Sequence, residues 1–131
     1  MSDSWNRAHR RYRLVHAVLA GIARTGRPEV PARLAAAVDA EFGDFGEFLR
    51  DVQARWYRAF DARLDTVLEV GPDDLPAAVA DVWRGLSDTM PAARLLLDAH
   101  AEHPALTALH EHHRRTLRAA TGIRHELRCP A

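Results

Sequence analysis

Hydrophobic residues recur every three or four positions along most of the chain, and short stretches containing Gly or Pro interrupt this pattern. Such spacing places side chains on one face of an α-helix, whereas a strand would need strict alternation. The pattern therefore predicts helices and no strand. The expected helices cover residues 4–25, 31–40 and 44–68, with further helices that start near residues 74, 91 and 104, the last ending near residue 120.

Sequence signals for helix starts support these boundaries. Ser4, Asp44 and either Asp73 or Asp74 are expected N-caps, because a short polar side chain can accept a hydrogen bond from a free N–H of the first turn. Asp44 is followed three residues later by Glu47, which is the spacing of a capping box. The helix after Asp44 carries a long apolar stripe, formed by Phe45, Phe48, Leu49, Val52, Trp56, Phe60, Leu64, Val67 and Leu68.

The composition is typical of one globular domain. Of the 131 residues, 47% are hydrophobic and 27% are charged, and the formal net charge is zero. We expect an all-α fold, a single compact bundle of five to six helices with short loops, in which residues 122–131 form a flexible tail. The longest apolar run, residues 14–23, is too short to span a bilayer, and the chain does not begin with a secretory signal. We therefore expect a cytoplasmic protein with no membrane partner.

The balance of charge also bears on partners. A net charge of zero argues against nucleic acid as a partner, because binding to phosphate backbones depends on excess positive charge. Two basic clusters, at residues 7–13 and 112–118, keep open a binding patch for nucleic acid or an acidic protein if both lie on one side of the bundle. Otherwise the two clusters are solvated helix faces.

The eight histidines raise the question of a metal site, since six of them follow residue 99. A helical metal site needs three or more ligands on facing surfaces, and the patterns HExxH, ExxH and HxxxH are all absent. The remaining candidates for binding a metal ion or haem are His110, His113, His16 and His103. His16 and His110 could meet if the first and last helices pack together. In the alternative interpretation, His100 and His103 interact with the negative end of a helix dipole, while the others hydrogen-bond to neighbours.

Other catalytic arrangements are missing from the sequence. The segment GLSDT, residues 85–89, lacks the second glycine of a nucleophile elbow, and the seven glycines are scattered singly, so no loop can cradle phosphate. The single cysteine, Cys129, excludes a disulfide within the chain. We assign no catalytic residue and no cofactor, and we favour a protein that is not an enzyme.

Two segments resemble parts of known families. LLLDAHAEHPALTALHEHH, residues 95–113, resembles the ligand-domain helices of TetR-type regulators, and FGDFGEFL, residues 42–49, is similar to a helix junction of iron superoxide dismutases. The first resemblance implies a regulator-like ligand-binding domain. Because GRPEVPARLAAAVDAEFG supplies no recognition helix, such a domain would lack a DNA-binding part, and the dismutase ligands have no counterparts here. We assign no family.

The helix over residues 4–25 offers apolar side chains over a wide arc. Trp5, Tyr12, Leu14 and Val18 are candidate interface residues, because apolar surface that a small bundle leaves uncovered marks an association site. The sequence therefore predicts a non-catalytic helical protein that associates with itself, as a homodimer, or with another protein. Two alternatives stay open: a protein that binds a small ligand, metal or haem through His16, His110 and His113, and the regulator-like domain.

Overall fold

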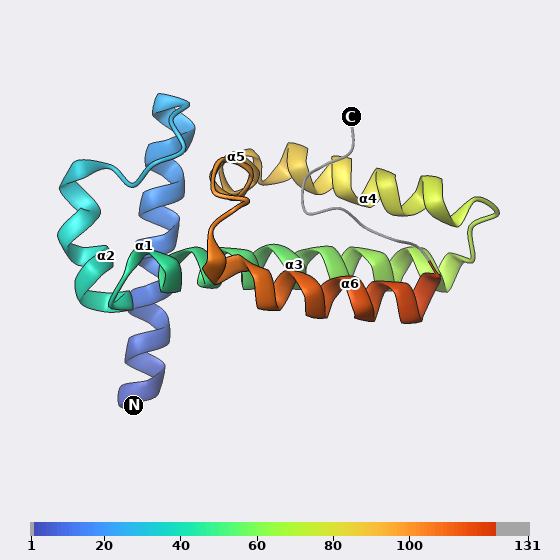
Figure 1. Cartoon of the computed structure of the whole chain (residues 1–131), viewed down its shortest axis with the longest axis horizontal. Coiled ribbons are helices and arrows are strands. Elements are labelled where there is room, and N and C mark those ends of the chain that lie inside the picture. Colours follow the sequence, from blue (N-terminus) through green and yellow to red (C-terminus); the bar gives the residue numbers. More distant parts are fainter. Residues whose placement is uncertain (1, 123–131) are drawn as a thin grey trace.

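The computed structural model describes residues 2–122 (Figure 1). Every regular element in this range is a helix, which confirms the all-α prediction. The α-helices are α1 (Asp3–Thr25), α2 (Ala35–Phe42), α3 (Phe45–Val70), α4 (Leu75–Thr89), α5 (Pro91–Ala99) and α6 (Thr107–Thr121). Two short 3₁₀ turns, η1 (Ala32–Leu34) and η2 (Pro104–Leu106), precede α2 and α6. The expected tail lies outside the described residues from residue 123 onward.

Helix α3 is the element around which the bundle is built. It packs against α2, α4, α5, α6 and η2. In Figure 1, α4 and α6 run alongside α3, whereas α1 crosses the beginning of α3 and packs against α2 and α5. One end of the molecule is therefore formed by α1, α2 and α5. None of the helices in residues 2–122 combines the length and the apolar character that crossing a lipid bilayer requires.

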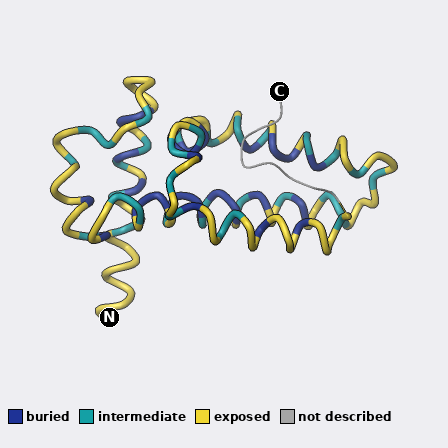
Figure 2. Tube along the Cα trace, in the orientation of Figure 1, coloured by how far each residue is buried: buried dark blue, intermediate teal, exposed yellow. Residues whose placement is uncertain are grey.

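The core follows the apolar stripe predicted for α3. The middle of the stripe is buried, whereas Phe45, Val67 and Leu68 at its two ends are half-buried. Figure 2 shows this buried surface continuing along α3 and the facing side of α4. Trp56 and Trp83 are both fully buried, and their rings meet edge to face with centroids 5.3 Å apart. Because such aromatic pairs prefer this geometry, they fix how α4 lies on α3.

The structure confirms two of the expected N-caps. The side chain of Asp44 accepts a hydrogen bond from the Glu47 N–H at 2.8 Å, and that of Asp74 accepts one from the Ala77 N–H at 3.0 Å. Each bond satisfies one of the N–H groups that a helix start leaves free. These two caps define where α3 and α4 begin.

The first expected cap is wrong. The Ser2 hydroxyl accepts the Trp5 N–H at 3.2 Å, so α1 begins at Asp3 and Ser4 lies inside the helix. Both serines have suitable chemistry, and only the backbone distinguishes them. The sixth helix also starts later than expected, because Pro104 opens a 3₁₀ turn and α6 itself begins at Thr107.

Helix α1 makes a close backbone approach to the loop that follows it. A Cβ atom added at the buried Gly21 would lie only 2.5 Å from Cγ of Pro31. Only glycine leaves room for the proline ring at this distance. Gly26, five residues later, ends α1 with a φ of 70°, a left-handed conformation that favours glycine. The chain can therefore turn back at once and lay residues 28–31 against the second half of α1.

Candidate functional site

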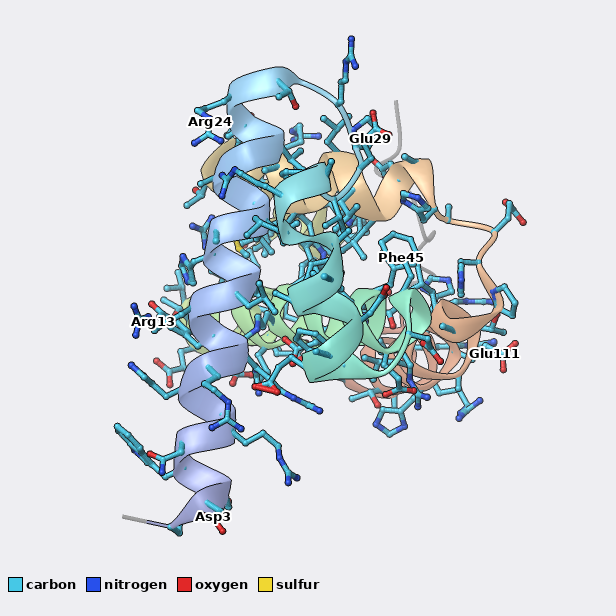
Figure 3. All side chains as sticks on the ribbon, turned by 90° about the vertical axis from the view of Figure 1, so that its left-hand side faces the viewer. Asp3, Arg13, Arg24, Glu29, Phe45 and Glu111 are labelled. Carbon is cyan, nitrogen blue, oxygen red and sulfur yellow. The ribbon has the colours of Figure 1, made fainter. Side chains whose placement is uncertain are left out.

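The described histidines do not converge on a metal site. Within residues 2–122, no group of three or more His, Cys, Asp or Glu side chains is placed to hold a metal ion. His16 is exposed on α1, whereas His110 is half-buried on α6 against α3. Figure 3 places α1 and α6 on opposite sides of the molecule. The structure therefore does not bring His16 and His110 together, because α1 packs against α2 and α5.

His110 joins α6 to α3 through a tyrosine. Its Nδ1 atom lies 2.9 Å from the hydroxyl of Tyr57, a side chain that is only 6% exposed. Burial raises the pKa of Tyr57 to about 12, while Arg94 and a hydrogen bond with Gln53 act in the opposite direction. Tyr57 is therefore neutral at ordinary pH, and its hydroxyl and Nδ1 of His110 form a hydrogen bond that joins α3 to α6.

His113 is enclosed on the same side of α3. Its Nε2 atom lies 3.1 Å from an oxygen of Asp61, and its ring stacks on that of Tyr57 with centroids 3.9 Å apart. Only 4% of His113 is exposed. Burial lowers the pKa of His113, although the hydrogen bond and charge of Asp61 oppose this effect. Because the ring is covered and its Nε2 is engaged, His113 is positioned as a packing residue rather than as a base or ligand.

The other two histidines of this region shape the turn between α5 and α6. Nδ1 of His100 donates a hydrogen bond to the Leu96 carbonyl at 2.9 Å, which occupies an acceptor at the end of α5. Nδ1 of His103 accepts the N–H of Ala105 at 3.1 Å and so caps η2. His103 therefore already has a role in the backbone geometry, and nothing places it near His110 as a second ligand.

Two spaces near these residues test the small-ligand alternatives. A hollow of about 200 Å³ between α3 and α6 is lined by Ala54, Tyr57, Arg58, Asp61, Leu109, His112, His113 and Thr116. Sites for drug-sized ligands and cofactors measure roughly 300–1,000 Å³, so this hollow is small for haem or a regulator's effector. A second gap, inside the bundle beside Gln53 and Arg94, is too narrow to hold a water molecule. Neither space resembles a ligand cavity.

A buried arginine stabilises the centre of the bundle. The guanidinium of Arg94 on α5 lies between the rings of Trp56 and Trp83, 4.6 and 4.7 Å from their centroids. It also pairs with Asp98, one turn along the same helix, at 2.8 Å. Cation–π contacts strengthen when they are removed from water. These contacts satisfy the buried charge and tie α5 to both α3 and α4.

Two of the exposed large hydrophobic side chains of the described chain lie on α1. Six exposed residues follow one another at intervals of three or four and so share one side of this helix, which we call the α1 outer face. They are Trp5, His9, Tyr12, His16, Ala20 and Ala23. Trp5 and Tyr12 are each 49% exposed. None of the six is an arginine or a carboxylate, but Arg13 lies at the edge of the face and the guanidinium of Arg55 on α3 lies 5.6 Å from the Tyr12 ring centroid.

The first turns of α1 extend beyond the rest of the bundle. Residues 3–9 are all exposed, and Figures 2 and 3 show this segment projecting past α2 and α3. Trp5 stacks on His9 with centroids 5.2 Å apart, and Tyr12 contacts His16 at 4.3 Å. The aromatic half of the outer face is therefore ordered along the helix before any partner binds.

The other two candidate interface residues lie elsewhere. Val18 is completely buried in the core, so its prediction as an interface residue is wrong. Leu14 is half-buried and contributes to an open groove of about 520 Å³ between α1 and α2, together with Arg10, Arg13, Ala37, Ala40 and Glu41. Leu14 lies half a helical turn away from Trp5, since nine residues at about 100° each amount to two and a half turns. It is not part of the α1 outer face.

The two basic clusters do not merge into one patch. The first lies on α1 and the second on α6, and Figure 3 shows Arg13 of α1 and Glu111 of α6 on opposite sides. Arg10 of the first cluster pairs with Glu41 at 2.8 Å. In the second, Arg114, Arg115 and Arg118 line a small hollow with Glu111. Each cluster therefore has a carboxylate close to its arginines, Glu41 in the first and Glu111 in the second.

Comparison with known protein families, with curated proteins and with solved structures finds no match.

Sequence reasoning missed the polar contacts that organise the interior. Tyr57 and His110 are 53 positions apart, so no local pattern links them. Arg94 and Asp98 did leave a local signal, because their four-residue spacing is that of a helical ion pair. The apolar neighbours of Arg94 along α5 could have indicated that this pair faces the core.

Proposed function

We propose that the protein functions by association with a second copy of itself through the α1 outer face, and that it has no catalytic role. The observation that carries this proposal is the half-exposure of Trp5 and Tyr12 on one side of α1, where the six face residues carry no formal charge of their own. Large aromatic side chains are typical of the centres of protein interfaces, and a contiguous exposed apolar surface marks a contact site.

The energetics favour a weak dimer. Burying the exposed half of one such aromatic side chain contributes on the order of 2–3 kcal/mol, so four per dimer contribute on the order of 10 kcal/mol. Association costs roughly 4–15 kcal/mol in lost translational and rotational freedom. The two quantities are similar, and dimerisation should therefore depend strongly on concentration. The formal net charge of zero means that the whole molecules do not repel each other, whereas α1 itself carries five arginines and a single carboxylate, Asp3, so the contact should strengthen with added salt.

The histidine-based alternatives have less support. His110 and His113 are engaged with Tyr57 and Asp61, and the hollow beside them is small. Association requires no such cavity. It uses the side chains of Trp5 and Tyr12, which remain half-exposed although Trp5 stacks on His9 and the Arg55 guanidinium lies over the Tyr12 ring.

Sedimentation equilibrium over a wide concentration range tests the proposal. The average mass should rise with concentration from 14.6 kDa toward twice this value. The double variant Trp5→Ala/Tyr12→Ala should remain monomeric. Val70→Ala is the matched control, because Val70 is 80% exposed at the far end of α3. A wild-type protein that stays monomeric at the highest concentration would refute self-association.

A further inference from the structure

The α1 outer face has a gradient of side-chain size. Its first half carries Trp5, His9 and Tyr12, whereas its last two members are Ala20 and Ala23. The two halves also differ in support. The bulky half includes the projecting turns, while the alanine half lies where Val15, Val18 and Ile22 anchor the opposite side of α1 in the core. The end of the face with Trp5 and His9 therefore projects beyond the bundle, whereas the end with the two alanines is backed by the core.

We propose that two copies of the chain pack their α1 helices antiparallel, so that the aromatic half of each outer face lies on the alanine half of the other. This inference rests on the proposed self-association and specifies its geometry. The register places Trp5 of one protomer opposite Ala23 of its partner, and Tyr12 opposite His16. His9 lies opposite Ala20. Every large side chain then faces a smaller one or a flat ring.

A parallel arrangement would not fit this surface. It would set Trp5 against the same residue of the partner and leave a gap between the alanines, whereas well-packed interfaces match the density of protein interiors. The antiparallel arrangement also lays the projecting turns of each protomer along a rigid segment of the other. In the parallel arrangement, the two projecting segments would support only each other.

The dimensions of α1 set the strength of this contact. Its 23 residues span about 35 Å, and a strip one helix wide, about 10 Å, has a footprint on the order of 350 Å² per protomer. Stable specific interfaces bury roughly 800 Å² per partner, so this contact belongs with the small, transient ones. The inferred dimer is a reversible one whose population follows the protein concentration.

Site-specific crosslinking distinguishes the arrangements. In a Cys129→Ser background, which removes the native thiol, single cysteines are introduced as His9→Cys, Ala20→Cys and Val70→Cys. All three positions are exposed, so the fold should tolerate the changes, and circular dichroism verifies this. A short thiol-reactive crosslinker is then added to each variant alone and to equimolar mixtures, at a concentration where sedimentation shows dimer.

The antiparallel register predicts that the mixture of the His9→Cys and Ala20→Cys proteins gives at least a several-fold higher yield of crosslinked dimer than either protein alone. Val70→Cys should give only background yield. Efficient crosslinking of the His9→Cys protein to itself would overturn the antiparallel register in favour of a parallel one. Background yields throughout, with sedimentation still showing dimer, would place the interface on another surface. A monomer in sedimentation would instead refute the proposed function itself and leave a different protein as the occupant of this face.

Discussion

The hydroxyl of Tyr57 lies 2.9 Å from Nδ1 of His110, and this contact joins the two helices that run side by side along the length of the bundle. The neighbouring His113 stacks on the same tyrosine ring at 3.9 Å. One buried phenol thus organises two of the histidines that the sequence suggested as metal ligands. Their placement favours a structural role, and the consequences for stability can be measured.

Replacing Tyr57 by Phe should lower the free energy of unfolding at neutral pH and should remove the loss of stability that the wild type shows at alkaline pH. At neutral pH, losing one hydrogen bond should lower the free energy of unfolding by about 1 kcal/mol. The wild-type pKa of Tyr57 is raised from 10.0 to about 12 by burial, so between these values the unfolded chain releases its proton first and stability falls as pH rises. Near pH 11 this loss is about 1 kcal/mol, and the Phe variant should lack it. Urea unfolding at both pH values checks this. Equal alkaline losses in the two proteins would contradict the assignment.

His113 should make the fold less stable in mild acid. Because burial lowers its pKa in the folded protein, the unfolded chain binds a proton first as pH falls. The stabilising contribution is therefore complete above the unfolded pKa of about 6.5 and declines below it. His113→Gln keeps a donor for Asp61 but does not titrate, so it should lose less stability between about pH 8 and pH 5.5 than the wild type.

The control for that measurement is His112→Gln, an identical change at an exposed position on the same helix. It should keep most of the wild-type difference in unfolding free energy between the two pH values, because the charge of His112 is the smallest of the named influences on the pKa of His113. If His113→Gln also kept the whole difference, the acid sensitivity would have to come from other groups.

Two glycines inside helices should respond to alanine in opposite directions. Gly21→Ala puts a Cβ 2.5 Å from a carbon of Pro31, so the loop must shift and stability should fall by about 1–3 kcal/mol. At Gly85 the nearest atom is Nη1 of Arg63, the end of a flexible side chain, 3.3 Å away. Gly85→Ala should therefore raise the free energy of unfolding by up to about 1 kcal/mol through helix propensity. Thermal unfolding of both variants provides the comparison. A destabilised Gly85→Ala protein would show that Arg63 cannot move aside.

The N-cap of α3, Asp44, should contribute much more to global stability than the N-cap of α1, Ser2. Asp44→Ala removes the cap of α3, the central helix, and should cost about 1 kcal/mol. Ser2→Ala removes the cap of the projecting turns of α1, which can fray without unfolding the core. Denaturant unfolding of the dilute monomer should detect the first change and not the second. A similar loss in both variants would mean that the start of α1 unfolds together with the core.

Local patterns predicted the elements well and their contacts poorly. The stripe on α3 and the caps at Asp44 and Asp74 follow from spacing within a few residues, and the structure confirms them. The meeting of His16 with His110 depended on which helices are neighbours, which no local spacing encodes. Helix α1 illustrates the same difficulty on one element. It has two apolar arcs, one with Val18 and one with Trp5, and only the positions of α2 and α5 decide which arc becomes the core.

The placing of the three tryptophans gives the protein two separate optical reporters. Trp56 and Trp83 share one enclosed environment beside Arg94. Trp5 is half-exposed to solvent near the N-terminal end of α1. Emission from the enclosed pair reports whether the interior is intact. A blue shift of the Trp5 emission, obtained as the difference between the wild type and a Trp5→Phe variant, would report contact between molecules, so that folding and assembly can be followed separately by fluorescence in these two proteins.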